Sequence, residues 1–265
     1  PSRFFRPTAQ VYAAQGEVRA RVALLSGCIM PIVQARTMEA AVRVLQRNGC
    51  QVVVPQGQLC CGALNLHSGD RSQARAMARR NIRVFLESGA DAVLVASAGC
   101  GSAMKECHEL LRDDPEYGPL AQRFSGMVQD ITEFLVQLPL EPPQGELKQR
   151  VTYQDPCHLA HAQRIAQAPR SILQAIPGLE YVEMEGASQC CGAAGIYSIV
   201  QQGMARQLLE EKMAKVKATS AQVIATANPG CVLQLEAGVR GVGLPARVCH
   251  VVELLDEAYR STAGA

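Results

Sequence analysis

The sequence predicts an α/β protein built from two tandem βαβ-type repeats, each a parallel sheet flanked by helices, with the two repeats in pseudo-twofold relation. Two observations support this fold class. Landmarks of the first half recur about 130 residues later, and short apolar runs alternate with segments of helical periodicity in both halves. Such alternation is typical of a parallel sheet that is covered by helices on both faces.

The repeat is carried mainly by cysteines. Each half contains a single cysteine, then an adjacent pair followed by glycine, and then a cysteine preceded by glycine. The intervals are 32 and 39 residues in the first half, and 33 and 40 in the second. A further landmark aligns MVQDITEFL with RVCHVVELL, which places Asp130 opposite His250. The cysteines are Cys28, Cys60, Cys61 and Cys100 in the first half, and Cys157, Cys190, Cys191 and Cys231 in the second.

The extent of the repeat sets the domain boundaries that we expect. The segment LPLEPPQGELKQR between the two copies is rich in proline and charge, which is typical of a connection between domains. We therefore expect an N-terminal extension over residues 1–20, a first cysteine-rich domain over 21–137, a linker over 138–150 and a second cysteine-rich domain over 151–265.

In the first copy we expect three strands, RVALLS at 21–26, QVVVP at 51–55 and DAVLVAS at 91–97. A helix is expected over 35–49, where apolar residues recur at helical spacing. A second helix is expected between Ser68 or Asp70 as N-cap and Gly89 as C-cap.

The second copy repeats this order. Its expected strands are RVTYQ, LEYVEM and AQVIATA, around helices near 169–175 and 202–217. The cysteines of both copies follow these strands, and ligands bind at the carboxyl ends of strands in open α/β sheets. We therefore expect the eight cysteines to converge as two quartets.

Four converging thiolates can hold zinc, copper(I) or an iron–sulfur cluster. Structural zinc favours C-x-x-C knuckles, whereas Ala103 and Gln234 stand at the third position after Cys100 and Cys231. A cluster several ångströms across accepts two adjacent cysteines more readily than a single tetrahedral ion does. The pattern favours iron–sulfur, with zinc in one or both repeats as the alternative.

Other residues near these positions are weaker candidates. His158 and His250 are candidates for hydrogen bonding behind the metal ligands, although single histidines are more often structural. Cys50, Cys107 and Cys249 lie outside the repeat, and buried packing is the better interpretation for each. Among them, Cys107 could be turned back toward the site by a helix that starts at Gly101.

Composition excludes several classes of function. Aromatic residues make up 4% of the chain, there is no Trp, and the net charge is +2, so no nucleic-acid partner is expected. No apolar stretch reaches the length of a membrane span, and the N-terminus lacks the apolar core of a secretory signal. Eleven cysteines without sign of export favour metal or redox chemistry over a disulfide framework, and hence a cytoplasmic location.

Two copies of this motif resemble the cysteine-rich CCG domains found in heterodisulfide reductase, in lactate-utilisation proteins and in the iron–sulfur subunit of bacterial glycolate oxidase. The segments LLSGCIMPIV, QLCCGALNLHSGD, CCGAAGIYSI and ANPGCVLQLEAG are most similar to the C-terminal part of the glycolate oxidase subunit. The resemblance extends from about Val22 to Tyr259.

The resemblance implies an electron-transfer subunit of a glycolate or other 2-hydroxy-acid dehydrogenase. A separate flavoprotein subunit would oxidise the substrate, and electrons would pass through one or two [4Fe-4S] clusters toward a quinone or another carrier. Partners would hold the protein peripherally at the inner face of the cell membrane. In the family a ferredoxin-like region precedes the repeats, and this sequence contains none. The chain alone is expected to oxidise no hydroxy acid.

Three alternatives remain open. The chain could be a relative of the lactate-utilisation proteins. A zinc-containing structural and docking module of the same complex would carry the same cysteines without redox activity. A thiol–disulfide oxidoreductase would resemble heterodisulfide reductase, whose motifs end in C-x-x-C. Ala103 and Gln234 replace the final cysteines here, which weakens that interpretation.

Overall fold

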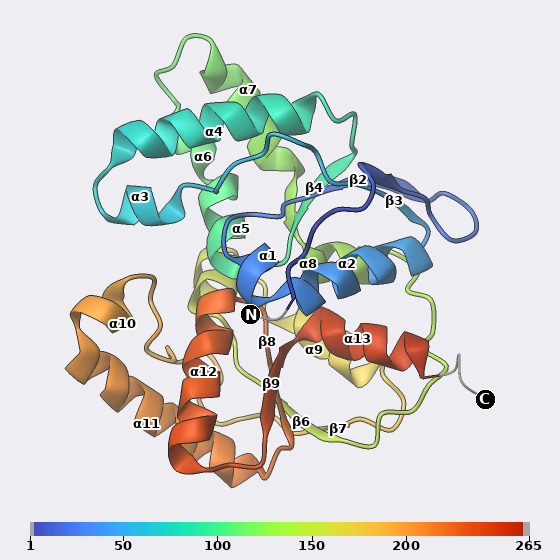
Figure 1. Ribbon diagram of the computed structural model, residues 1–265, viewed down its shortest axis with the longest axis vertical. Helices are drawn as coiled ribbons and strands as arrows, with labels where there is room; N and C mark the ends of the chain where they lie inside the picture. The colour runs from blue at the N-terminus through green and yellow to red at the C-terminus, as the bar shows by residue number, and fades with distance from the viewer. Residues whose placement is uncertain (1–2, 262–265) are drawn as a thin grey trace. The chain divides into compact units, whose positions relative to one another are not determined.

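A computed structural model describes residues 3–261. The chain divides into two compact units, Pro1–Glu141 and Pro142–Ala265. Each unit contains one β-sheet with helices packed on it (Figure 1).

The sheet of the first unit has five strands in the order β1-β3-β2-β4-β5. Strands β2 to β5 are parallel, and β1 pairs antiparallel with β3 at the edge of the sheet. The strands are β1 Val11–Tyr12, β2 Ala20–Leu24, β3 Cys50–Val53, β4 Ala92–Val95 and β5 Val128–Asp130.

The sheet of the second unit has four strands in the order β7-β6-β8-β9, and all of them are parallel. This is the order β3-β2-β4-β5 of the first unit, strand for strand. The predicted fold of two tandem α/β repeats is therefore confirmed. The strands are β6 Arg150–Tyr153, β7 Glu180–Tyr181, β8 Val223–Thr226 and β9 Arg247–His250.

Helices connect the strands of each sheet. The first unit contains α1 Met30–Val33, α2 Ala35–Arg47, α3 Ala63–His67, α4 Arg71–Leu86, α5 Ala98–Lys105, α6 Cys107–Leu110, α7 Tyr117–Met127 and α8 Ile131–Gln137. The second contains the π-helical turn η1 His158–Ala162, then α9 Gln167–Gln174, α10 Tyr197–Val200, α11 Gln202–Thr219, α12 Pro229–Val242 and α13 Val251–Arg260.

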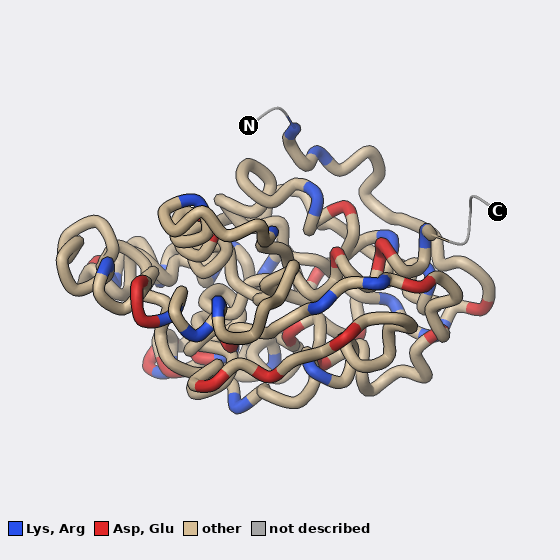
Figure 2. The backbone as a smooth tube through the Cα atoms, turned by 90° about the horizontal axis from the view of Figure 1, so that it is seen from below, with Lys and Arg blue, Asp and Glu red and all other residues tan. Residues whose placement is uncertain are grey.

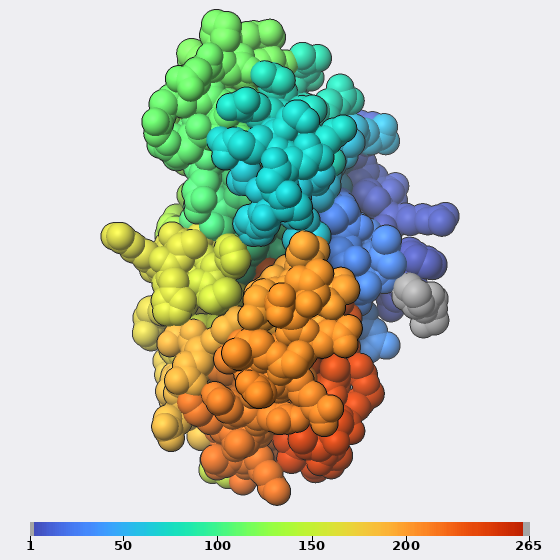
Figure 3. Space-filling view, turned by 90° about the vertical axis from the view of Figure 1, so that its left-hand side faces the viewer, coloured from blue at the N-terminus to red at the C-terminus, as the bar shows by residue number. Residues whose placement is uncertain are grey.

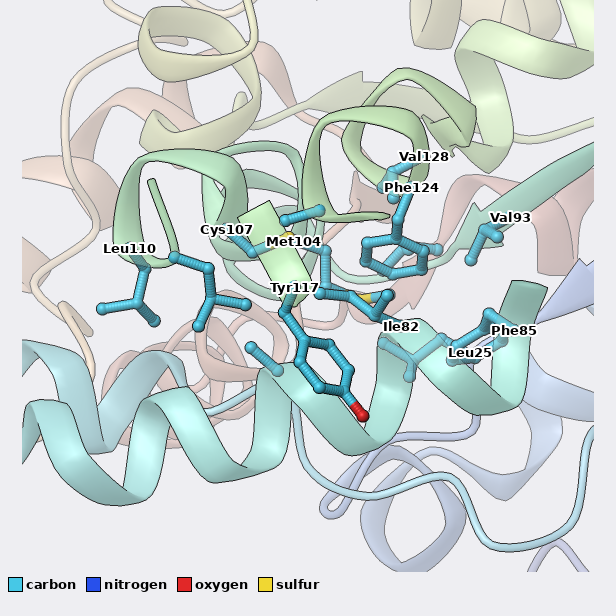
Figure 4. Close-up of a cluster of buried hydrophobic side chains, with 14 of the residues drawn as sticks. Leu25, Ile82, Phe85, Val93, Met104, Cys107, Leu110, Tyr117, Phe124 and Val128 are labelled. Atoms are coloured by element: carbon cyan, nitrogen blue, oxygen red, sulfur yellow. The ribbon is translucent and has the colours of Figure 1, made fainter. Parts of the chain in front are cut away.

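The strands of the first unit are buried on both faces, as expected for a parallel sheet between helices. Ala23 of β2 and Val93 of β4 face a core formed with α4 and α7, where the ring centroids of Phe85 and Phe124 lie 6.0 Å apart (Figure 4). Val22, next to Ala23, points to the other face and is equally buried. Two further helices cover this sheet: α2 packs against β3, and α8 packs against β4.

In the second unit, α11 and α12 form a core with β8. Met213 of α11 and Leu235 of α12 pack with Ile224 of the strand, and Cys191 and Cys231 belong to the same cluster. The segments that carry Cys191 and Cys231 therefore pack directly on the core of this unit.

The short helix α10 and the start of α11 lie at the surface of the second unit, where Figure 3 shows this part of the chain in orange. Their apolar side chains Ile199, Val200 and Met204 are exposed. The buried residues of α11 come later along the helix, from Ala205 onward. The helix therefore packs on the sheet along its middle and its C-terminal part.

The predicted helix boundaries differ in detail from the structure. Asp70, not Ser68, is the N-cap of α4, because its carboxylate accepts the Gln73 N–H at 3.1 Å. At the other end the C-cap is Glu87 and not Gly89, which adopts a left-handed φ of +65° in the following turn. The sequence pattern did not predict the short strands β1 and β5.

Charged residues of both signs are interspersed along the backbone (Figure 2). In the part of the chain that the structure describes, no helix has the length and apolarity that crossing a membrane requires.

Candidate metal centres

In each unit, the candidate cysteines follow three strands that run side by side. In the first unit, Cys28 follows β2, the pair Cys60 and Cys61 follows β3, and Cys100 lies in the first turn of α5 after β4. Because β3, β2 and β4 are adjacent and parallel, their carboxyl ends bring these loops to one edge of the sheet.

The thiols of the first quartet are joined in a row by side-chain hydrogen bonds. Cys28 is bonded to Cys60, Cys60 to Cys61, and Cys61 to Cys100. Donation from Cys28 and from Cys61 lowers the pKa of Cys60 to about 2, and the bond to Cys60 raises the pKa of Cys28. The bond from Cys61 lowers the pKa of Cys100.

The second quartet repeats this row in the same order. Cys157 is bonded to Cys190, Cys190 to Cys191, and Cys191 to Cys231. Donation from Cys157 and from Cys191 lowers the pKa of Cys190 to about 2, as at Cys60. The structure thus brings together all four candidate cysteines in each half.

The glycine after each cysteine pair is required by the backbone. Gly62 and Gly192 have left-handed φ angles of +79° and +89°. Their N–H groups point at the preceding cysteine sulfurs, with Gly62 N to Cys60 Sγ at 3.5 Å and Gly192 N to Cys190 Sγ at 3.3 Å. Backbone donors of this kind stabilise thiolates and tune sulfur-bound centres.

The N-cap residues of two helices, which sequence reasoning missed, hydrogen bond to sulfur. Asn228 precedes α12, and its Nδ2 donates to Cys231 Sγ at 3.7 Å. Ser97 precedes α5 in the equivalent place, and its bond to Cys100 lowers the pKa of that thiol. Neither side chain caps its own helix. Each stands three residues before the last cysteine of its motif, a position where the residue type alone indicates only a helix cap.

The two candidate histidines have different settings. His158 lies beside Cys157, with Nδ1 3.5 Å from the sulfur. His250 is fully buried, and its Nδ1 accepts the Val252 N–H at 3.1 Å as the N-cap of α13. Asp130 caps α8 in the same way, which explains why the sequence repeat aligns an acid with a histidine.

The three cysteines outside the motif are buried, as predicted. Cys107 starts α6 and faces the main core, with Sγ 3.4 Å from Ser125 Oγ. Burial raises the pKa of Cys50 and of Cys107 to about 11, and raises that of Cys249. These thiols therefore behave as small apolar residues.

Among residues 3–261, no group of three or more His, Cys, Asp or Glu side chains is arranged to hold one metal ion. Beside α11 of the second unit lies a groove of about 570 Å³, lined in part by Glu183, Glu211 and Lys215, and no candidate cysteine lines it.

Comparison with known proteins identifies the family. The model of the cysteine-rich CCG domain matches residues 22–105 and 151–236, one copy in each unit. The chain belongs to this family of cysteine-rich CCG domains. Both matches include all four cysteines of their repeat, which confirms the resemblance inferred from the motifs.

Two relatives of this CCG protein carry names that bear on function. The probable glycolate oxidase iron–sulfur subunit of Bacillus subtilis is 42% identical over 92% of this chain, which spans 56% of that protein's length. Lactate utilization protein A of Bacillus licheniformis is 31% identical over 89% of the chain and 99% of its own length.

A solved structure supports the fold. The crystal structure of a hypothetical protein from Helicobacter pylori superposes with a TM-score of 0.68 at 9% identity, over 97% of this chain and 52% of that one. At such low identity the likeness extends to the fold alone.

Proposed function

We propose that this chain is the cysteine-rich part of an iron–sulfur electron-transfer subunit in a glycolate or related 2-hydroxy-acid dehydrogenase. Each quartet holds one [4Fe-4S] cluster. A partner flavoprotein oxidises the hydroxy acid and delivers the electrons, which leave toward a quinone or another carrier. The relatives named above support this class of protein.

The observation that carries the proposal is the row of four thiols in each unit. Four cysteine sulfurs are the complement of ligands for a [4Fe-4S] cubane. A cubane has separate iron atoms at its corners, so its ligands need not point at one centre, whereas a zinc ion requires them to converge. The thiols of each unit are hydrogen-bonded pairwise in a row that includes two adjacent cysteines. Adjacent cysteines fit the separate iron atoms of a cluster more readily than they fit one tetrahedral zinc ion.

The surrounding residues fit such a group. The N–H groups of Gly62 and Gly192 already point at sulfur, and Asn228 adds a side-chain donor in the second unit. Cys28 of the first unit is exposed, whereas Cys191 and Cys231 of the second unit are buried. The thiols of the two quartets therefore differ in their exposure to solvent. A bound cluster would accept and release single electrons, and the chain's residues would fix its position and its hydrogen bonds.

Anaerobic metal analysis and EPR test this proposal. Protein prepared without oxygen should contain iron and acid-labile sulfide and should give an EPR signal on reduction. Cys61→Ser and Cys191→Ser should each remove about half of the iron, because each change breaks one quartet. Colourless protein with stoichiometric zinc would instead support a structural and docking module, and loss of all iron from one substitution would mean a single shared centre.

A further inference from the structure

A buried lysine lies behind the second cysteine pair. Lys212 of α11 is 1% exposed, and charged side chains are rarely so deeply buried without a partner. Its Nζ donates to the carbonyl oxygens of Gly186 at 2.8 Å and Ala187 at 3.3 Å. Both partners belong to the loop that leads into Cys190 and Cys191, so the ammonium is fixed by the cysteine-bearing segment itself.

The charge of Lys212 acts on the cysteines. It contributes to lowering the pKa of Cys190, after the hydrogen bonds from Cys157 and Cys191. Burial lowers the pKa of Lys212, and the nearby Cys191, Asp155 and Cys190 oppose this effect. A centre bound by four thiolates carries net negative charge, which further favours the ammonium form.

Other charges nearby are already paired. Asp155 receives two N–H groups from Arg170, each at 2.8 Å, and Arg170 also binds Glu183. Lys215 lies on the same helix as Lys212 but is half-exposed and bonds to the Gln189 side chain. The ammonium of Lys212 is therefore bonded to neutral carbonyls, and no salt bridge within residues 3–261 cancels its charge.

The first unit has a neutral residue in the equivalent place. Asn81 of α4 precedes Lys212 by 131 residues, the interval that also separates Cys100 from Cys231. It is likewise 1% exposed, and it binds the loop before its own cysteine pair. Its Oδ1 accepts the Leu59 N–H at 2.8 Å, and its Nδ2 donates to Cys60 O at 3.0 Å. The two halves therefore use the same position to hold the same loop, but only the second adds a charge there.

We propose that the Lys212 ammonium raises the reduction potential of the centre held by the second quartet, making it the more easily reduced of the two. This inference rests on the proposed function. Reduction adds one negative charge to the centre, and a fixed positive charge in a poorly solvated setting stabilises that charge more than water-exposed groups do. Lys212 acts through its charge, as a tuning residue rather than a ligand.

The test is a redox titration of anaerobically prepared protein, with dithionite as reductant and EPR as readout. Lys212→Gln keeps an N–H donor for the loop and removes the charge, and Lys212→Arg keeps the charge. Lys217→Gln removes an exposed charge from the same helix and is the matched control. Cys191→Ser and Cys61→Ser assign the signals, because each leaves only one intact quartet.

Lys212→Gln should lower the reduction equilibrium constant of the second centre about tenfold, which corresponds to about 59 mV for one electron. The first centre should not change, and Lys212→Arg and Lys217→Gln should match the unmodified protein. An unchanged potential in Lys212→Gln with full iron content would overturn the inference.

A second comparison covers the case in which Lys212→Gln does not fold. The second centre, measured in Cys61→Ser, should have a higher potential than the first centre, measured in Cys191→Ser. A potential of the second centre lower than or equal to that of the first would overturn the inference, and this comparison needs no substitution of Lys212. Absence of iron from the unmodified protein is a different result, because it would refute the proposed function.

Discussion

Gly192→Ala should destabilise the protein much more than the equivalent Gly62→Ala. Both glycines adopt left-handed φ angles, which cost a residue with a Cβ about 1–2 kcal/mol. A Cβ at Gly192 would lie 2.4 Å from Ala205 O of α11, a backbone atom that can move only with its helix. At Gly62 the nearest atom is Ala74 Cα of α4 at 3.3 Å, which requires a much smaller adjustment.

The magnitudes follow from these contacts. Overpacking against backbone adds about 1–3 kcal/mol. We therefore expect the free energy of unfolding to fall by about 2–5 kcal/mol in Gly192→Ala, combining the left-handed and overpacking costs. For Gly62→Ala we expect a fall of about 1–2 kcal/mol from the left-handed cost alone. Urea unfolding of protein with matched iron content, followed by circular dichroism, measures the difference.

Gly203→Ala is the control for glycine substitution itself. Gly203 lies in α11 with open space around it, so alanine should have no effect or stabilise by up to about 1 kcal/mol. Equal losses of stability in Gly62→Ala and Gly192→Ala would refute the argument that close approach of α11 requires the second glycine.

Two further predictions concern buried groups. Burial raises the pKa of Asp130 to about 6, so its contribution to stability is present below the unfolded value near 4 and is lost as the pH rises through 6. The stability of the wild-type protein relative to Asp130→Asn should fall by roughly 3 kcal/mol between pH 4 and pH 7, and urea unfolding across that range would contradict this if the difference stayed constant. Cys107→Ala should keep all bound iron and cost about 1 kcal/mol of stability, whereas Cys100→Ala should lose the first centre; iron loss from Cys107→Ala would show that Cys107 is a ligand.

Much of the fold could be predicted because the two halves repeat one pattern. The intervals between cysteines revealed the repeat, and the apolar runs before the cysteines placed them after strands, which the structure shows to be parallel and adjacent. Strand β1 was missed because only two residues, Val11 and Tyr12, pair with β3, and so short a run has no detectable periodicity. Asp70, one of the two predicted N-caps of α4, is confirmed, whereas the C-cap is Glu87 and not Gly89, because a glycine soon after a helix is also typical of the turn that follows it.

The candidate site was predicted less completely. The candidate cysteines are recognised from their residue type and spacing, so the two quartets could be predicted from the sequence. Ser97 and Asn228 could not, because a Ser or Asn before a helix normally caps that helix, and only coordinates show the side chain turned to sulfur. Lys212 was missed because a lysine in an amphipathic helix is ordinarily solvated, and its burial depends on the loop folded over it.

The antiparallel strand β1 has a consequence for how this chain avoids unwanted association. A parallel sheet ends in strands whose outer N–H and C=O groups can recruit another polypeptide. Val11 and Tyr12 occupy that outer row along β3 through Val53 and Val52. In the second unit no strand among the described residues covers β7, which consists only of Glu180 and Tyr181 and so offers little backbone to an incoming strand. In both halves the strand at this border, β1 or β7, is only two residues long, so each sheet presents a short edge there.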